Sequence, residues 1–514
     1  MNNPNLKKQL PKNLIMNLLS FLTRTLIGLW IIPYLVKNIG LSAYGLVPLA
    51  MFFSAYINII IQSINSAINR FLLIAIQQNN TLEANRVFNT SLIIILSFIA
   101  LQSIIMTLVI INLSYLISIP IGLANDAFWL FLLTFIGFSI SLLRGVFATT
   151  LFAHNRLDIL RLMEMIQIIS RTLIIIFLFS IDTPQLVYVG IANILASIII
   201  LLLTLYYSKK IYSPLHVNFT LFDRKYVKEL SQMGIWVLIN QIGSLLFLKI
   251  DLFIANRFLG ASMAGEYAII LQWNTLIRVF AGLLSGVITP ITMIFYAKDK
   301  REDMIKMVKI AFKLMAIGMS IIIGEITALS GDILSIWMGE EFRYLEYLML
   351  FSLLPLIINL SVYPLFAIQT AYNRVKIPAI VTLILGLGNL ILAIVLVKWT
   401  TLGLYGIVLA SATILTLKNS IFTPIYASYL LKIPLLSFTK YYLLSIFFYI
   451  SSYTITIILA SFYHIDSYLI LFWIMALSIL FSLILFYIYL RFDNQLYQIF
   501  NKLLEYKKTK KGKS

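Results

Sequence analysis

Long apolar stretches separated by short polar segments run along the chain from about residue 13 to residue 490. About 20 consecutive apolar residues are enough for one helix to cross a bilayer. The pattern therefore predicts an all-α polytopic membrane protein with about fourteen transmembrane helices. Their approximate bounds are 13–36, 43–68, 88–117, 126–152, 160–181, 185–207, 232–256, 264–294, 308–330, 344–370, 378–398, 402–430, 440–462 and 467–490.

The composition agrees with this class and excludes others. Of the 514 residues, 61% are hydrophobic and 11% are charged, a balance that soluble globular domains do not have. The formal charge of +19 lies in short loops between apolar stretches, so nucleic acid is not an expected partner. The chain has no cysteine and three widely separated histidines, so neither a metal site nor another cofactor is expected.

The basic residues also predict a topology. If the N-terminus is cytoplasmic, 29 of the 39 Lys and Arg residues fall on the cytoplasmic side and four fall on the outer side. This excess follows the positive-inside rule and predicts an even number of spans with both termini in the cytoplasm. Charge alone is equally consistent with twelve spans. The expected location is the cytoplasmic membrane of a bacterium or an archaeon.

Two short motifs recur at nearly the same offset. The motif G-x-S-x-x-G occurs at 40–45 and at 260–265, and the motif A-x-N-R occurs at 153–156 and at 371–374. All four copies lie at junctions of predicted spans. They predict two six-span lobes of parallel orientation, with a binding site between the lobes near the middle of the membrane.

This repeat divides the chain into five parts. The N-terminal lobe is expected at 1–207 and the C-terminal lobe at 232–431, joined by a cytoplasmic linker at 208–231. A further pair of spans follows at 432–491, and the basic tail 492–514 is expected to bind anionic lipid.

Six basic residues interrupt the predicted spans, and each costs roughly 2.5–3.5 kcal/mol on insertion scales if placed at the bilayer centre. Such residues usually face a cavity and contact a substrate, so we expect a cationic cavity that binds an anion. The fork of arginine suits an anion that offers two oxygens, which makes the two central arginines the first candidates. For the others, ion pairing or contact with head groups is the alternative. The six are Arg24 and Arg278, followed by Arg144, Arg171, Lys249 and Lys418.

Amide and acidic residues complete the candidate site. Amides on one face of the second span and in the seventh span are expected to bind sugar hydroxyls, with helix–helix contact as the alternative. Asp251 and Glu325 are candidates for coupling transport to H⁺ or Na⁺, with structural pairing as the alternative, and Glu266 is the one further acid noted within the spans. The candidate amides are Asn58, Gln62, Asn65 and Gln241.

Two segments carry a family resemblance: "IPYLVKNIGLSAYGL" after the first span, and "KIDLFIANRFLGASMAGEYAI" with its Asp251, Gly260, Gly265 and Tyr267. The chain resembles the Wzx-type polysaccharide transporters of the multidrug/oligosaccharidyl-lipid/polysaccharide (MOP) superfamily. The resemblance implies a V-shaped, MATE-like bundle with alternating access. It implies flipping of a polyprenyl-diphosphate-linked glycan, such as an O-antigen precursor of lipopolysaccharide, with membrane lipids and polysaccharide polymerases as partners.

Alternative functions differ in the charge they need. A flippase for lipid II also needs a cationic cavity and stays open as an alternative. A cation-coupled multidrug antiporter needs central carboxylates, whereas the first span carries Arg24. An enzyme is not expected, because the chain has no nucleotide-binding loop, no metal-ligand cluster and no large outer loop.

Overall fold

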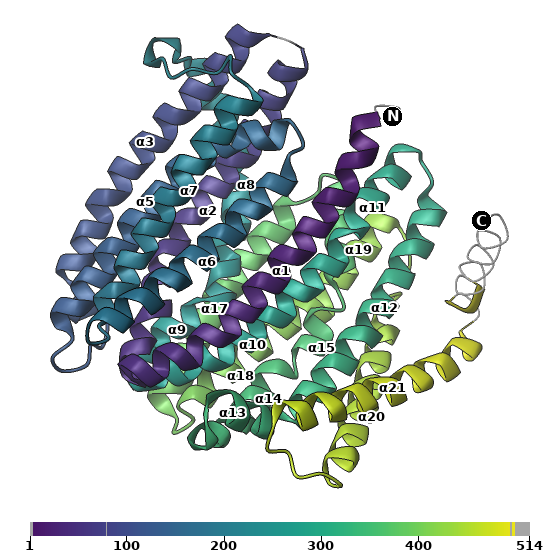
Figure 1. The fold of residues 1–514 in the computed structure, drawn as a ribbon. Coiled ribbons are helices and arrows are strands. Elements are labelled where there is room, and N and C mark those ends of the chain that lie inside the picture. The colour runs from purple at the N-terminus through teal and green to yellow at the C-terminus, as the bar shows by residue number, and fades with distance from the viewer. Residues whose placement is uncertain (1–3, 79, 494–495, 499–514) are drawn as a thin grey trace. The chain divides into compact units, whose positions relative to one another are not determined.

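The structure, a computed structural model, describes residues 4–78, 80–493 and 496–498. Within these residues the regular elements are all helices, joined by turns and loops (Figure 1). The helices form two compact units. The first contains Met1–Gln272 and Ala379–Ile407, and the second contains Trp273–Pro378 and Val408–Ser514. The two lobes were predicted from a sequence repeat, whereas these two units are defined by contacts between residues. The lobe boundaries therefore stay a prediction.

The first unit contains the helices up to the first half of α10, together with most of α17. Their bounds are α1 Pro4–Ile39, α2 Leu41–Gln77, α3 Thr81–Ile111, α4 Leu113–Leu116, α5 Ala124–Ala153, α6 Leu157–Ile181, α7 Leu186–Ile211, η1 Phe219–Leu221, α8 Arg224–Leu248, α9 Ile250–Ile254, η2 Ala255–Leu259, α10 Ala261–Gly286 and α17 Lys376–Trp399.

The second unit contains the remaining helices. Their bounds are α11 Ile288–Ala297, α12 Arg301–Ala328, α13 Ser330–Met338, η3 Glu340–Leu345, α14 Glu346–Leu353, α15 Leu356–Asn359, α16 Tyr363–Ala371, α18 Leu404–Leu417, η4 Lys418–Phe422, α19 Thr423–Leu431, η5 Thr439–Tyr441, α20 Tyr442–Ala460 and α21 Tyr468–Phe492.

The predicted class is confirmed. Among the described residues, eleven helices are long and apolar enough to cross a membrane, and two bent helix pairs raise the number to thirteen. In α2 the apolar part Leu41–Phe53 is shorter than the 18 residues required for a span. The side chains of residues 54–67 lie outside the described part of the chain. The count of fourteen therefore stays a prediction.

The repeated motifs form equivalent turns. Gly40 separates α1 from α2 with φ +82°, and Gly260 separates η2 from α10 with φ +100°. Both values lie where a side chain is strained, which explains the glycine at each position. Asn155 and Asn373, one in each copy of the second motif, have φ +56° and +51°, a left-handed conformation that asparagine tolerates well.

The last glycine in each copy of the G-x-S-x-x-G motif, Gly45 or Gly265, allows two helices to pack closely. A Cβ atom on Gly45 would lie 2.5 Å from the carbonyl oxygen of Ala261, and one on Gly265 would lie 2.6 Å from that of Leu41. The two motifs therefore bring α2 and α10 into backbone contact within the first unit. Any side chain at either position would force these helices apart.

The predicted linker 208–231 is bound to α3. Asn85, Asn89 and Thr90 on α3 are buried, and their side chains form hydrogen bonds of 2.7–3.0 Å with backbone groups of residues 214–223. These side chains satisfy an irregular segment that has few backbone partners of its own. This segment is consequently a fixed part of the first unit.

In the second unit, a nearly buried ion pair joins the end of the last described transmembrane helix to α12. Lys313 Nζ lies 2.6 Å from Asp493 Oδ2, with the two side chains 8% and 11% exposed. Tyr489 also donates to Asp493, at 3.1 Å. Burial, the largest single effect, raises the pKa of Asp493, but the hydrogen bonds from Lys313, the Leu496 backbone N–H and Tyr489, together with the charge of Lys313, hold the pKa below its usual value.

We expect Asp493→Asn to lower the free energy of unfolding by about 3 kcal/mol at neutral pH, because it leaves Lys313 buried without a counter-charge. Because the pKa of Asp493 is lowered in the folded state, its contribution is complete above the unfolded pKa of about 3.9 and is lost as the pH falls further. The difference in thermal unfolding between native chain and variant should therefore shrink below about pH 4. An equal difference at all pH values would contradict the ion pair.

Candidate substrate-binding site

Two polar faces meet between α1 and α6 in the first unit. Both helices place polar residues three or four positions apart, which puts them on one face of each helix. The face of α1 contains Gln9, Asn13, Asn17, Ser20 and Arg24, and the face of α6 contains Asp158, Arg161, Glu164, Gln167 and Arg171.

Hydrogen bonds connect these faces in register. Gln9 Nε2 donates to Asp158 Oδ1 at 2.7 Å, and the backbone N–H of Asp158 donates to Asn13 Oδ1 at 2.9 Å. One turn further, Arg161 Nε donates to Asn17 Oδ1 at 2.6 Å. The residue numbers rise together on both helices, so α1 and α6 are parallel along this contact.

The contact leads to a cluster of three arginines around Glu164. Arg161 Nη1 donates to both carboxylate oxygens at 2.8 and 2.9 Å, and Arg24 Nη2 lies 3.7 Å from Oε2. Arg144 on α5 is close enough to interact electrostatically with the same carboxylate. Three positive charges against one negative charge leave a surplus of two. The side chain of Arg24 is 53% exposed, so the cluster is accessible to a ligand.

Glu164 corrects the sequence analysis, which noted only Asp251, Glu266 and Glu325 as acids within the spans. The expectation was wrong because Glu164 also lies within a membrane-length helix, facing Arg24. A signal was present in the sequence: Arg161, Glu164, Gln167 and Arg171 follow one another at intervals of three, three and four residues. That spacing marks a polar stripe on one helix face.

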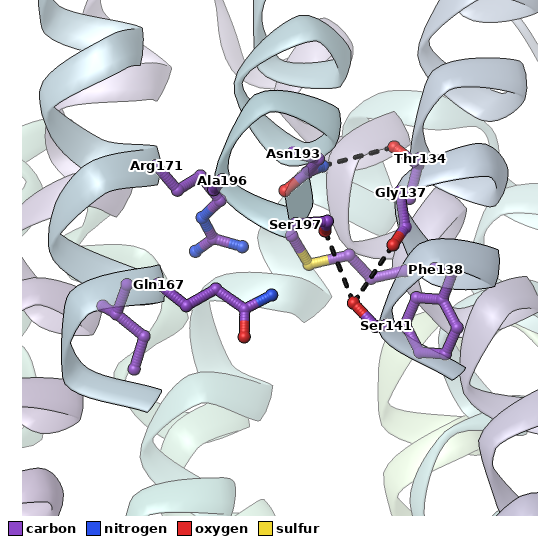
Figure 2. Close-up of a pocket in the computed structure, with 11 residues that line it drawn as sticks. Thr134, Gly137, Phe138, Ser141, Gln167, Arg171, Asn193, Ala196 and Ser197 are labelled. Atoms are coloured by element: carbon purple, nitrogen blue, oxygen red, sulfur yellow. Dashed lines mark hydrogen bonds between the residues drawn. The ribbon is translucent and has the colours of Figure 1, made fainter. Parts of the chain in front are cut away.

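Beyond this cluster, the stripe on α6 enters a cavity of about 220 Å³ bounded by α2, α5, α6 and α7. Figure 2 shows Arg171 and Gln167 pointing from α6 toward polar residues on α5 and α7. The lining residues are Met51, Thr134, Gly137, Phe138, Ser141, Gln167, Ile168, Arg171, Asn193, Ala196 and Ser197.

Close packing of α5 and α7 positions the far wall of this cavity. A Cβ atom on Gly137 would lie 3.1 Å from the carbonyl oxygen of Asn193, so only glycine allows this approach without a shift. Asn193 Nδ2 donates to Thr134 at 3.3 Å, and Ser141 Oγ lies 3.4 Å from Ser197 Oγ (Figure 2). The wall is therefore an ordered row of amide and hydroxyl groups.

A second polar feature of the first unit is the break between α8 and α9 at Lys249, where the chain bends by 47°. Asn389 on α17 donates to the carbonyl oxygen of Leu246 at 2.8 Å and to Asp251 Oδ1 at 3.4 Å. A side chain that donates to a helix carbonyl competes with the backbone hydrogen bonds of the helix, which explains the bend. Tyr267 donates to Asp251 Oδ2 at 3.0 Å. Asp251 is only 2% exposed, and its carboxylate is therefore both buried and hydrogen-bonded.

The other predicted cations lie in the second unit, each in its own environment. Arg278 donates to Asn274 Oδ1 at 2.6 Å, and Asn274 in turn donates to the backbone of Ser352 at 3.1 Å. Lys418 Nζ lies 5.7 Å from the ring centroid of Phe366. The role of Asn274 as the group that orients Arg278 was not identified from the sequence.

Glu325 is 1% exposed in the second unit and contacts Ser478 on α21. Its Oε1 atom has no hydrogen-bond partner among the described residues. Buried carboxyl groups of this kind are commonly functional or protonated.

The structure thus brings together part of the predicted set. Arg24 forms an ion pair with Glu164, Arg144 interacts with the same carboxylate electrostatically, and Arg171 lies further along the face of α6. Gln241 lies on α8 and Lys249 directly follows α8, both in the first unit. Neither residue belongs to the polar face of α6. Asn58, Gln62 and Asn65 lie outside the described side chains.

Comparison with known proteins identifies relatives in sequence and in fold. A family model described as "polysaccharide biosynthesis protein" matches residues 10–295. The uncharacterized membrane protein EpsK of Bacillus subtilis (strain 168) is 33% identical over 420 residues, which cover 81% of this chain and 82% of that protein.

Solved structures of MOP-superfamily transporters share the fold. An inward-facing multidrug resistance MATE family transporter has a TM-score of 0.61 and 16% identity, covering 80% of this chain and 96% of its own. A MOP superfamily transporter from Pyrococcus furiosus has a TM-score of 0.61 and 17% identity, covering 82% and 96%. For that protein, the reversed polarity of its binding pocket suggests a different function. The MATE-like fold predicted from the sequence is confirmed.

We expect Asn389→Ala to lower the free energy of unfolding by about 1–3 kcal/mol, because the Leu246 carbonyl and Asp251 both lose a buried donor. Thermal unfolding in detergent measures the effect. The matched control is Asn38→Ala, because Asn38 bonds a helix carbonyl on an exposed surface and should change stability by less than about 0.5 kcal/mol. Equal effects of the two substitutions would contradict the role of Asn389 at the bend.

We expect Glu164→Gln to destabilise the chain by about 1 kcal/mol, because three neighbouring arginines then lack their shared counter-charge. The loss should shrink as salt rises from about 50 mM to about 500 mM, since ions screen the repulsion between accessible charges. Glu302→Gln, at an exposed position on α12, is the control. A loss that is independent of salt would mean that Glu164 acts by packing rather than by charge.

Proposed function

Because the chain belongs to the polysaccharide biosynthesis protein family and has the fold of the MOP-superfamily transporters, we propose that it flips a polyprenyl-diphosphate-linked oligosaccharide. The direction is from the inner to the outer leaflet of the cytoplasmic membrane, where the glycan enters surface polysaccharide synthesis. The proposal includes the predicted topology, with both termini in the cytoplasm.

The observation that carries this proposal is the arginine cluster around Glu164. Its surplus of two positive charges matches an anionic diphosphate, and guanidinium groups can hold phosphate oxygens in pairs. Arg24 is only loosely paired, at 3.7 Å, and more than half of its side chain is exposed. A charged group in that position on a membrane-length helix favours a water-filled or ligand-filled cavity rather than lipid.

Arg278 is the proposed counterpart in the second unit. Its hydrogen bond to Asn274 fixes its Nε atom, so the other guanidinium nitrogens can donate to a ligand. In alternating access, the head group would leave one set of arginines for another as the cavity changes the side on which it opens. Asp251 and Glu325 are proposed to couple this change to H⁺ or Na⁺.

A flippase for lipid II is the alternative within the same chemistry, since lipid II also carries a diphosphate. Parallel transport assays with the two lipids distinguish these possibilities. Rapid flipping of lipid II with slow flipping of the oligosaccharide lipid would assign the chain to peptidoglycan synthesis instead. Cation-driven drug efflux without lipid flipping would support an antiporter.

The test is flipping of a fluorescent polyprenyl-diphosphate oligosaccharide in proteoliposomes. We expect Arg24→Ala and Arg278→Ala each to reduce the rate by at least about tenfold, the effect of losing roughly one charge-assisted hydrogen bond. Arg24→Lys should retain an intermediate rate, because it keeps the charge and loses the fork.

Lys37→Ala is the matched control, because Lys37 is an exposed basic residue in the last turn of the same helix. It should flip at the native rate. Flipping that survives both arginine substitutions would leave the function in place and reject the site. Loss of flipping in the Lys37 control as well would point to disturbed insertion or folding.

A further inference from the structure

The cavity beside α6 contains a cation, Arg171, for which the described residues provide no carboxylate partner. Arg171 Nε is buried and has no hydrogen-bond partner, and no carboxylate forms an ion pair with Arg171 in the described part of the chain. An unpaired buried charge is costly, so a fold that retains one usually obtains its counter-charge from a ligand. Figure 2 shows the guanidinium directed into the cavity rather than along the helix surface.

The rest of the lining is polar and uncharged. Gln167 and Asn193 contribute amide groups, and Thr134, Ser141 and Ser197 contribute hydroxyl groups. Arg171 is the one charged residue among the described residues of this lining. The cavity therefore offers several hydrogen-bond donors and acceptors for hydroxyl groups. Its one positive charge can balance one negative charge of a ligand.

The size of the cavity restricts its ligand further. Its volume of about 220 Å³ is below the roughly 300–1,000 Å³ of pockets for drug-sized ligands. Phe138 and Met51 add an apolar side against which the C–H face of a sugar ring can pack. One monosaccharide unit fits this combination of size and chemistry better than a lipid tail, which would leave the amides and Arg171 unsatisfied.

We propose that this cavity is a subsite for one carboxylate-bearing sugar, a uronate, within the glycan. Arg171 binds the carboxylate through its fork, and the amides and hydroxyls of α5, α6 and α7 bind the ring hydroxyls. The inference rests on the proposed flippase function and adds that the transported glycan is acidic.

The distance along α6 places this subsite beside the diphosphate site. Arg171 follows Glu164 by seven residues, or about 10 Å at 1.5 Å per residue. In a lipid-linked glycan the first sugar is bonded directly to the diphosphate. A head group at the arginine cluster would therefore bring one of the first sugars to Arg171, and the uronate is assigned to the lipid-proximal end of the glycan.

Two lipid-linked monosaccharides that differ only at C6 test the proposal: polyprenyl-diphosphate glucuronate and polyprenyl-diphosphate glucose. In proteoliposomes, the native chain should flip the glucuronate lipid at least about tenfold faster, the difference expected from one charge-assisted hydrogen-bond pair. Arg171→Gln should abolish this preference, so that the ratio of the two flipping rates falls to about one. Arg171→Lys should retain part of the preference, because it retains the charge.

Two further variants keep the test independent of folding. Ser141→Leu fills the cavity without removing a charge and should also abolish the preference, and Arg257→Gln, at an exposed arginine outside the cavity, should preserve it. Thermal unfolding of each purified variant identifies those that are misfolded.

The outcomes separate the subsite from the function. Flipping of both lipids at equal rates by the native chain would overturn the acidic-sugar subsite and leave the flippase intact. If neither lipid is flipped, the proposed function fails, and saturation-transfer NMR with methyl glucuronide and methyl glucoside tests the cavity directly. Binding of the glucuronide that Arg171→Gln removes would then support the subsite, and equal signals from both proteins and both sugars would overturn it.

Discussion

The compensation of charge inside a largely apolar helix bundle constrains the first unit more than any other interaction. Arg24 on α1 and Arg161 on α6 form ion pairs with Glu164, and Arg144 on α5 interacts electrostatically with the same carboxylate. Any one of these guanidinium groups would be costly among apolar helices without a counter-charge. Because one carboxylate serves three cations, the helices are held together while a net positive charge remains. The same arrangement thus stabilises the helix contact and leaves uncompensated positive charge that an anionic ligand can neutralise.

The polar ladder between α1 and α6 makes this arrangement specific in position. Apolar helices in a membrane can slide or rotate at little cost, whereas hydrogen bonds such as Gln9 to Asp158 and Arg161 to Asn17 are satisfied in only one register. That register brings Arg24 to Glu164 and directs Arg171 into the cavity beside α7. The ladder and the proposed ligand sites are therefore consecutive parts of one helix face.

Glycines and asparagines determine where the backbone departs from straight, separated helices. Gly45 and Gly265 allow backbone contact, and Gly137 allows the approach of α5 to α7 that closes the cavity. Asn389 donates a hydrogen bond to a carbonyl group of α8 next to the bend at Lys249. Small residues permit close packing and side-chain amides supply donors inside the bundle, both of which compensate for the weak hydrophobic attraction between membrane helices.

Much of the fold could be predicted from the sequence, because crossing a bilayer imposes helices of a minimum apolar length. The predicted stretches fall on helical segments, and the repeated motifs lie at junctions between helices, as predicted. The positive φ values of their glycines and asparagines came only from the structure. The family resemblance also followed from local motifs. The candidate site was only partly predictable: Arg24, Arg144 and Arg171 were identified as isolated cations, without their partners or their common helix face.

The sequence by itself determined the class of protein, the helices and the excess of positive charge within them, since these depend on composition and local periodicity. Only the tertiary structure decided which charges are neutralised and which are not. Glu164 is the counter-charge of Arg24 because α1 and α6 are parallel and in register. Among the described residues no carboxylate pairs with Arg171, because the helices that face it across the cavity contribute amides and hydroxyls. Compensation of a buried charge depends on which side chains other helices bring within a few ångströms. Neighbours along the chain do not specify that information.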